Sequence, residues 1–310
     1  MKTIEIPGIE PKRLDIALAE VLGLSRSKAQ KIIADGRVLV NGAEANAHEL
    51  VSSASNIEIA EPKAPVIDPN AKPPAPLNIL YEDADVLVVN KPAGLLVHPT
   101  TTSTEPTLLD LLRAHIPGLD AVGDDKARAG IVHRLDKLAS GVVIVAKTPE
   151  AFAHLKAQFA QRLTEKRYTA LVMGNVTEDS DTITFPIARS QSNARMAARP
   201  NSQEGKDAIT HFDVLHRYAS ATLLDVRIET GRTHQIRAHF FALCHPVAGD
   251  ELYTIRGVKT IPLGRLFLHA RSLGINLPNG EQKTFEAPLP PELELALTKL
   301  SEPHLQRINK

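Results

Sequence analysis

The segment 130–145, GIVHRLDKLASGVVIV, places ionisable side chains between two apolar runs. His133, Arg134, Asp136 and Lys137 stand close together there, which predicts a polar turn where the chain leaves one buried strand and enters the next. A carboxylate held ionised among cations suits a nucleophile better than a general acid. A plainer interpretation fits the spacing as well, with Asp136 capping the turn and pairing with Arg134. The spacing alone leaves both interpretations open.

Hydrophobic periodicity predicts the elements that must position this turn. The pattern indicates a hairpin, a helix, a buried strand, a second helix and a further strand over residues 79–89, 107–115, 141–147, 148–159 and 168–173. Beyond residue 173 we expect short strands and turns with few long helices. This order favours an α+β domain with a largely antiparallel sheet over a regular alternation of strands and helices.

The first 60 residues predict a compact module of two helices and a hairpin. Apolar residues recur at helical spacing over 14–22, and a glycine follows. A second helix is expected from Ser25, a good N-cap, to Gly36. The strand 38–40 precedes Asn41-Gly42, which is a strong signal for a tight hairpin turn.

The second helix carries basic side chains away from its apolar face. Arg26, Lys28 and Lys31 project to that side, and Arg37 follows just beyond the end of the helix. A solvated helix face would explain these residues taken alone. However, the string LSRSKAQKIIADGRVLVNG resembles the small RNA-binding domain named after ribosomal protein S-four. The resemblance covers most of residues 12–60 and implies that these four side chains contact RNA phosphates.

A proline-rich stretch separates this module from the rest of the chain. Six of the 16 residues in the segment 61–76, EPKAPVIDPNAKPPAP, are proline, and no apolar periodicity survives there. Such a composition is typical of a semi-rigid linker. The sequence therefore predicts an RNA-binding domain over 1–60, a linker over 61–76 and a second, larger domain over 77–310.

Composition narrows the class of protein. The 310 residues include 36 basic and 36 acidic side chains, so the chain as a whole is neutral. Within it, the C-terminal part carries more basic than acidic side chains. The apolar runs fall short of the about 20 residues that a membrane helix needs, and the N-terminus lacks the apolar core of a signal peptide. The single cysteine, Cys244, excludes an intramolecular disulfide. We therefore expect a cytoplasmic protein with no membrane partner.

Several common chemistries lack their motifs in this sequence. Neither GxxxxGK[ST] nor GxGxxG occurs, and HExxH is missing. His234, His239 and Cys244 are near one another, but the five-residue step between the histidines does not place both on one helix face. We therefore expect neither a cofactor nor a metal.

The string GIVHRLDKLASG resembles the signature of the RluA-type pseudouridine synthases. The segments LYEDADVLVVNKPAGLLVHP, KRYTALVMG, IETGRTHQIRAH, HPVAGD and LFLHA are similar to that family's other blocks and occur in its order. The S-four-like module in front is the arrangement typical of the bacterial enzymes that act on large-subunit ribosomal RNA. The resemblance implies isomerisation of uridine to pseudouridine in RNA, which requires no redox cofactor and no energy input.

The resemblance also implies roles for individual residues. Asp136 matches the catalytic aspartate that assists glycosidic bond cleavage after base flipping, by attack on the sugar or uracil or as a base at the ribose. Tyr168 matches the active-site tyrosine, which can stack on the flipped base and serve in removal of the proton from its fifth carbon. Arg237 matches the arginine that pairs with the aspartate. Lys166 and Arg134 are expected to contact phosphates.

This chain departs from the family pattern at two places. Leu138 and Ala139 stand where the family usually has Asp and Thr, and Cys244 occupies a position that is commonly glycine. These departures concern local hydrogen bonding of the loop more than the chemistry, because Asp136, Arg134 and Gly141 are retained.

Two functions of other classes stay open at the level of sequence. A ribosome-assembly factor that binds RNA without catalysis would lack Asp136 or Tyr168, and both are present. A metal-independent ribonuclease could use His133 and His234 as acid and base. For the favoured function we expect RNA as the partner, either ribosomal RNA or an assembling large ribosomal subunit, and a monomeric enzyme.

Overall fold

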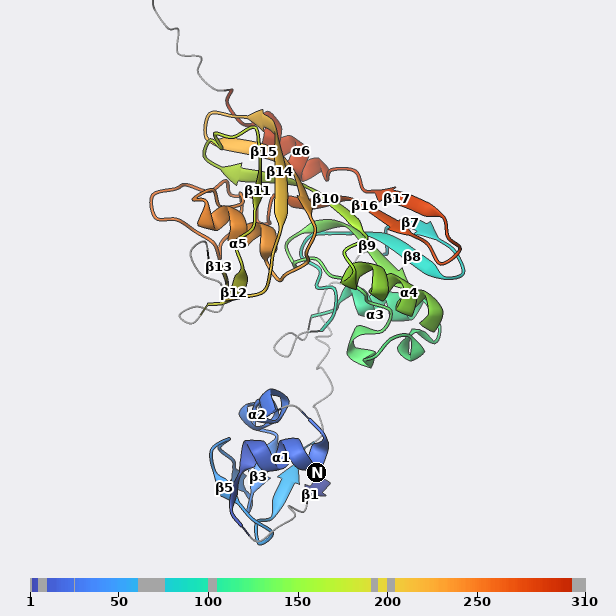
Figure 1. The fold of residues 1–310 in the computed structure, drawn as a ribbon, viewed down its shortest axis with the longest axis vertical. Coiled ribbons are helices and arrows are strands. Elements are labelled where there is room, and N and C mark those ends of the chain that lie inside the picture. The colour runs from blue at the N-terminus through green and yellow to red at the C-terminus, as the bar shows by residue number, and fades with distance from the viewer. Residues whose placement is uncertain are drawn as a thin grey trace, which may run out of the picture. The chain divides into compact units, whose positions relative to one another are not determined.

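The computed structural model describes residues 2–4, 10–24, 26–60, 76–99, 105–190, 195–199 and 204–302, without the side chains of Lys2, Ser27, Lys28 and Lys31. The chain divides into two compact units, Met1–Pro69 and Asn70–Lys310, both drawn in Figure 1. The predicted linker lies outside the described residues except for Pro76, and so does the predicted N-cap Ser25.

The N-terminal unit combines two helices with short strands. Strands β1, β6, β3 and β4 form one sheet in that order, and β2 pairs with β5. The helix predicted over 14–22 and the hairpin are confirmed, because the turn residues Asn41 and Gly42 have φ of 52° and 80°. The elements are β1 (Lys2–Ile4), β2 (Lys12–Arg13), α1 (Leu14–Leu22), α2 (Arg26–Ala34), β3 (Val38–Val40), β4 (Ala43–Glu44), β5 (Leu50–Val51) and β6 (Ile57–Ile59).

The two helices of this unit share one apolar core. Leu14 and Leu18 of α1 are buried together with Ala29 and Ile33 of α2, and the strand residue Ile57 joins them. The helical spacing of these apolar residues thus buries one face of each helix.

The C-terminal unit is built on one large sheet, beside which β12 and β13 pair with each other in a separate two-stranded sheet. The strands of this unit are β7 (Ile79–Glu82), β8 (Val86–Lys91), β9 (Ser140–Ala146), β10 (Glu165–Met173), β11 (Ser180–Ile183), β12 (Ile187–Arg189), β13 (Met196–Ala198), β14 (Thr210–Arg217), β15 (Ala221–Ile228), β16 (Leu268–Asn276) and β17 (Gln282–Glu286). Its helices are α3 (Leu108–His115), α4 (Pro149–Ala160), α5 (Gln235–Ala242) and α6 (Pro291–Thr298), with short 3-10 turns at Leu119–Ala121 and Lys126–Arg128.

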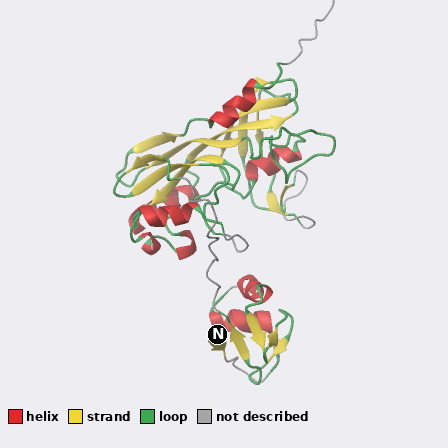
Figure 2. Ribbon diagram, turned by 180° about the vertical axis from the view of Figure 1, so that it is seen from behind, coloured by secondary structure: helices red, strands yellow, loops and turns green. Residues whose placement is uncertain are grey.

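The sheet follows the order β11-β14-β15-β10-β16-β9-β8-β7, and β17 pairs with β16. Its described pairs are antiparallel except for β16 with β9. Figure 2 shows the long strands with helices gathered near both ends of the sheet. The predicted α+β class is therefore confirmed. The expectation of short strands beyond residue 173 is confirmed for β11, β12 and β13 but wrong for β14, β15 and β16, which contain 8, 8 and 9 residues.

Local signals explain the helices that cover the β8–β9 half. Thr107 and Asp110 form a capping box at the start of α3. The Thr148 hydroxyl accepts a hydrogen bond from the Ala151 N–H at 3.1 Å, and Pro149 occupies the first helical turn of α4. Both helices predicted there are confirmed, and every residue of β9 between them is buried.

Candidate active site

Asp136 lies in the loop that leads into β9. The Ala139 N–H donates to the Asp136 carbonyl at 3.2 Å, and the Gly94 N–H donates to the Lys137 carbonyl at 2.8 Å. Leu138 packs against the main hydrophobic core, and Ala139 is buried. Leu138 and Ala139, which depart from the family pattern, therefore supply apolar contacts, while backbone hydrogen bonds hold the loop.

A buried lysine, absent from the residues predicted for the site, fixes the same loop. The Lys91 ammonium donates to the carbonyls of Pro92 and Leu95 at 2.8 Å and to that of Lys137 at 3.3 Å. Burial lowers the pKa of Lys91 to about 7, although the negative charge of Asp136 opposes this shift. The position of this lysine next to Pro-Ala-Gly in the sequence was the available signal.

The strand after the loop approaches its parallel neighbour closely. Gly141 pairs with Ala270 of β16 and has a φ of 119°. A Cβ at this position would lie 2.2 Å from the Ala270 carbonyl oxygen, so only glycine fits. Beside it, the buried Ser140 hydroxyl lies 2.8 Å from Nδ1 of His269. This contact sets where the Asp136 loop meets the centre of the sheet.

Tyr168 projects from the central strand β10, which pairs with both β15 and β16. The register of β10 against β16 shifts between Arg167 and Tyr168, and such an irregularity can redirect a side chain. Tyr168 is buried, and this burial, together with the charge of Asp136, raises the pKa of its hydroxyl above the ordinary value. The hydroxyl is therefore protonated at neutral pH.

Arg237 is presented by the short helix α5. His234, the N-cap, has a left-handed φ of 55°, and the Gln235 side chain accepts hydrogen bonds from the Arg232 N–H at 3.0 Å and the Thr230 hydroxyl at 2.7 Å. These hydrogen bonds fix the conformation of the turn that precedes α5. The guanidinium of Arg237, one turn further on, is thereby directed at the Asp136 loop.

The structure brings Asp136 and Arg237 into direct contact. Nη1 of Arg237 donates to Oδ2 of Asp136 at 2.9 Å, and the other edge of the guanidinium binds Asp250. Burial lowers the pKa of Arg237, but the carboxylates of Asp250 and Asp136 outweigh it and raise the pKa above its usual value. Among the described residues Asp136 makes no ion pair with Arg134. The interpretation in which those two neighbours pair is therefore wrong.

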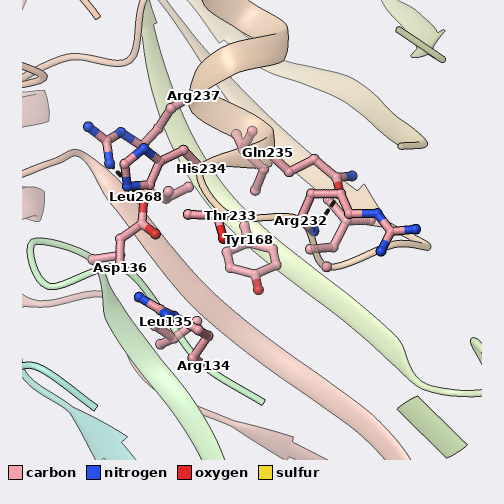
Figure 3. A pocket seen from close by; sticks show the side chains of 14 residues that line it. Arg134, Leu135, Asp136, Tyr168, Arg232, Thr233, His234, Gln235, Arg237 and Leu268 are labelled. Carbon is pink, nitrogen blue, oxygen red and sulfur yellow. Dashed lines mark hydrogen bonds and ion pairs between the residues drawn. The ribbon is translucent and has the colours of Figure 1, made fainter. Parts of the chain in front are cut away.

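Asp136, Tyr168 and Arg237 line one pocket, which Figure 3 shows together with Arg134 and His234. Leu268, Ile228 and Ile236 supply apolar lining beside the charged groups. The pocket therefore combines apolar surface beside Tyr168 with the carboxylate of Asp136.

A second pocket adjoins the first and shares Tyr168 and Arg134 with it. Its lining is rich in cationic side chains, namely Arg128, Arg134, Arg162, Lys166 and Arg232. Arg134 is exposed, with Nη1 3.4 Å from Nε2 of His98. Lys166 is buried and donates to the Glu229 carbonyl at 3.1 Å, and burial lowers its pKa to about 8. Positive charge at the mouth of the first pocket suits a polyanionic substrate.

The two histidines suggested for a ribonuclease are differently placed. His133 stacks on Phe159 at 4.6 Å, and its Nε2 accepts the Ile144 N–H at 3.0 Å. Burial lowers the pKa of His133 to about 3, so its ring is neutral and its acceptor nitrogen is occupied. His234 lines the first pocket, whereas His133 lines the second. This arrangement argues against a paired acid and base.

The basic residues of the N-terminal unit also make internal contacts. Nε of Arg26 donates to the buried carboxylate of Asp15 at 3.0 Å. The guanidinium of Arg37 donates to the Ala60 carbonyl at 3.1 and 3.0 Å. The side chains of Lys28 and Lys31 lie outside the described residues. The RNA contacts expected of these four residues stay a prediction.

The described part of the chain contains neither a candidate metal site nor a candidate membrane-spanning helix. No group of three or more His, Cys, Asp or Glu side chains there could hold a metal ion. No helix among the same residues is long and apolar enough to cross a bilayer.

Comparison with known proteins identifies the class of enzyme. The family model for RNA pseudouridylate synthase matches residues 85–242, and that for the S4 domain matches residues 12–56. The chain belongs to the RNA pseudouridylate synthase family. It is accordingly an RNA pseudouridine synthase, an isomerase that acts on RNA, with an N-terminal S4 domain.

Relatives and solved structures agree with this membership. The chain is 39% identical over 298 residues to RNA pseudouridine synthase YlyB of Bacillus subtilis, covering 94% of this chain and 96% of that protein. It is 38% identical over 304 residues to ribosomal large subunit pseudouridine synthase D of Nitrosomonas europaea, covering 94% and 86%. Human RNA Pseudouridylate Synthase Domain Containing 1 is similar in structure, with a TM-score of 0.58, 28% identity and coverage of 75% of this chain and 99% of that one.

Proposed function

We propose that this enzyme converts uridine to pseudouridine in large-subunit ribosomal RNA, in the cytoplasm. The observation that carries the chemistry is the contact of Asp136 with Arg237 in the pocket that Tyr168 also lines. The substrate follows from the similarity to ribosomal large subunit pseudouridine synthase D and from the S4 domain. The expected monomer stays a prediction.

The residues of this pocket take different roles in the proposed reaction. A uridine flipped out of the RNA would place its ring against Tyr168 and its glycosidic bond near Asp136, which assists the cleavage of that bond. The raised pKa of Tyr168 keeps its hydroxyl protonated, so stacking is a better role for this residue than proton removal. Arg237 orients the carboxylate of Asp136 through one N–H.

Cationic side chains of the second pocket would hold the RNA on either side of the flipped nucleotide. Arg134 and Lys166 are the two that sequence predicted, and Arg128, Arg162 and Arg232 join them. Arg26, Lys28, Lys31 and Arg37 of the S4 domain would add contacts to phosphates elsewhere on the RNA. Base identity is then checked in the first pocket, while the charge sets affinity.

Mapping pseudouridine in ribosomal RNA tests this proposal. Cells that lack the protein should lose one or more pseudouridines of the large-subunit RNA, and the wild-type enzyme should restore them. Asp136→Asn should not restore them, because the amide keeps the shape of the side chain without its charge. Asp225→Asn is the matched control, since Asp225 pairs with Thr169 on β10 and so faces away from Tyr168. An unchanged ribosomal map with losses in another RNA would refute the proposed substrate.

A further inference from the structure

We propose that Asp250 is a positioning residue for the reaction: it fixes Arg237 so that a single N–H reaches Asp136 and one carboxylate oxygen of Asp136 stays open to substrate. The inference rests on the proposed role of Asp136 in catalysis. Asp250 is the last residue of HPVAGD, one of the segments that resemble the family.

The contact between Asp250 and Arg237 has two parallel hydrogen bonds. Nε of Arg237 donates to Oδ2 of Asp250 at 2.6 Å, and Nη2 donates to Oδ1 at 3.0 Å. Such a two-pronged contact fixes the plane of a guanidinium as well as its position. Asp250 is held in turn, because its Oδ1 also accepts the N–H groups of Leu252 at 2.9 Å and Tyr253 at 3.0 Å.

Tyr253 restricts movement of the Arg237 guanidinium perpendicular to its own plane. The centre of the tyrosine ring lies 4.9 Å from Cζ of Arg237. The Tyr253 hydroxyl donates to the Met196 carbonyl at 3.0 Å and accepts the Met196 N–H at 3.1 Å, so the ring itself is anchored. Arg237 is therefore held in its plane by Asp250 and on one face by Tyr253.

This arrangement determines what Arg237 offers to Asp136. With Nε and Nη2 committed to Asp250, Nη1 reaches Oδ2 of Asp136 at 2.9 Å. No residue of the described part of the chain donates a hydrogen bond to Oδ1 of Asp136, and 16% of this side chain is exposed. One oxygen is thus anchored, and the other is available in the pocket.

The charges of the three groups lead to the same conclusion. Two carboxylates share one guanidinium, so the cluster keeps one net negative charge beside the pocket. Without Asp250, Arg237 could turn and form a two-pronged contact with Asp136, which would occupy both oxygens and neutralise the charge. Asp250 therefore keeps Asp136 oriented and reactive at the same time.

The test is Asp250→Asn in the full-length enzyme, assayed on a uridine-containing large-subunit ribosomal RNA fragment. We expect kcat to fall by about 100-fold or more, because a misplaced group of this kind costs about that factor. KM and the Kd for RNA should stay within about 3-fold, since Asp250 does not touch RNA. Asp225→Asn, which also removes a carboxylate that pairs with arginine, should stay within about 3-fold in all three quantities.

The outcomes separate this inference from the proposed function. A wild-type enzyme that is inactive on the ribosomal fragment contradicts the proposed substrate. An active wild type with an equally active Asp250→Asn protein overturns the positioning role. Parallel losses in kcat and in RNA affinity would overturn it too, because they would indicate a general disturbance of the site.

A second measurement applies even if Asp250→Asn does not fold. In Asp136→Asn, the proposal predicts that Asp250 alone still holds Arg237. The Nε–H resonance of Arg237 should therefore remain protected from solvent exchange as in the wild type, with the exposed Arg134 as the unprotected reference. Loss of this protection would show that Asp136 holds Arg237, and it would overturn the inference.

Discussion

Replacing Arg237 by Met should destabilise the C-terminal unit far more than replacing Asp136 by Asn. Arg237→Met leaves the fully buried carboxylate of Asp250 without its cation. Breaking a buried ion pair from one side costs about 3–5 kcal/mol. For a unit of this size each kcal/mol lowers the Tm by about 2–4 °C, so the expected loss is about 6–20 °C.

In Asp136→Asn the buried contact between Arg237 and Asp250 survives. What is lost is a single ion-pair hydrogen bond to a side chain that is 16% exposed, in an open pocket. Such a loss is closer to that of a surface pair, about 0–1 kcal/mol, which corresponds to about 0–4 °C. The two variants should therefore both lose pseudouridine formation while they differ clearly in stability.

Scanning calorimetry of the full chain, together with a pseudouridine assay, checks this expectation. Arg167→Met is the matched control, because Arg167 is 36% exposed and pairs with Glu165 and Asp225 on the other face of the sheet. Its Tm should change by no more than about 4 °C. The reasoning is refuted if Asp136→Asn lowers the Tm as much as Arg237→Met, or if Arg237→Met leaves the Tm unchanged.

Three further predictions concern backbone strain and charge. Gly141→Ala would place its Cβ 2.2 Å from the Ala270 carbonyl oxygen, whereas Gly280→Ala, also at positive φ, meets nothing within 4 Å. Overpacking lowers the free energy of unfolding by about 1–3 kcal/mol, so the Tm of Gly141→Ala should lie about 2–12 °C below that of Gly280→Ala. Equal Tm values would contradict the argument. Cys244→Gly should stabilise the protein by about 1 kcal/mol in a denaturant titration, because Cys244 is exposed and holds a left-handed φ of 64°. A destabilised Cys244→Gly protein would contradict the backbone-strain argument. Burial lowers the pKa of Lys166 to about 8, so its charge is present below that pH and lost above it. RNA affinity should then weaken as the pH rises from about 7 to about 9, and Lys166→Arg should abolish this dependence, which a binding titration can measure.

Local parts of the fold were predictable from the sequence. The helix Leu14–Leu22, the hairpin at Asn41-Gly42 and the helix that follows Thr148 depend on periodicity, caps and turn residues within a few positions of one another. The same holds for the buried strand after the Asp136 loop, whose apolar run is continuous in the sequence. Local patterns cannot give strand length, however, because pairing partners set it, and the three long strands beyond residue 173 were missed for that reason.

The candidate site, too, has features that the sequence predicts and features that depend on the tertiary structure. Sequence by itself determined that Asp136, Tyr168 and Arg237 are present in the expected order, and that cationic residues accompany them. Only the tertiary structure decided the partners: Arg237 reaches Asp136 across 101 positions and is clamped by Asp250, while Lys91 binds the carbonyl of Lys137 across 46. Burial by the packed sheet raises the pKa of Tyr168 and lowers that of Lys166. Residue types are local properties of the chain, whereas burial, charge pairing and the direction of a guanidinium depend on which distant segments the sheet brings together.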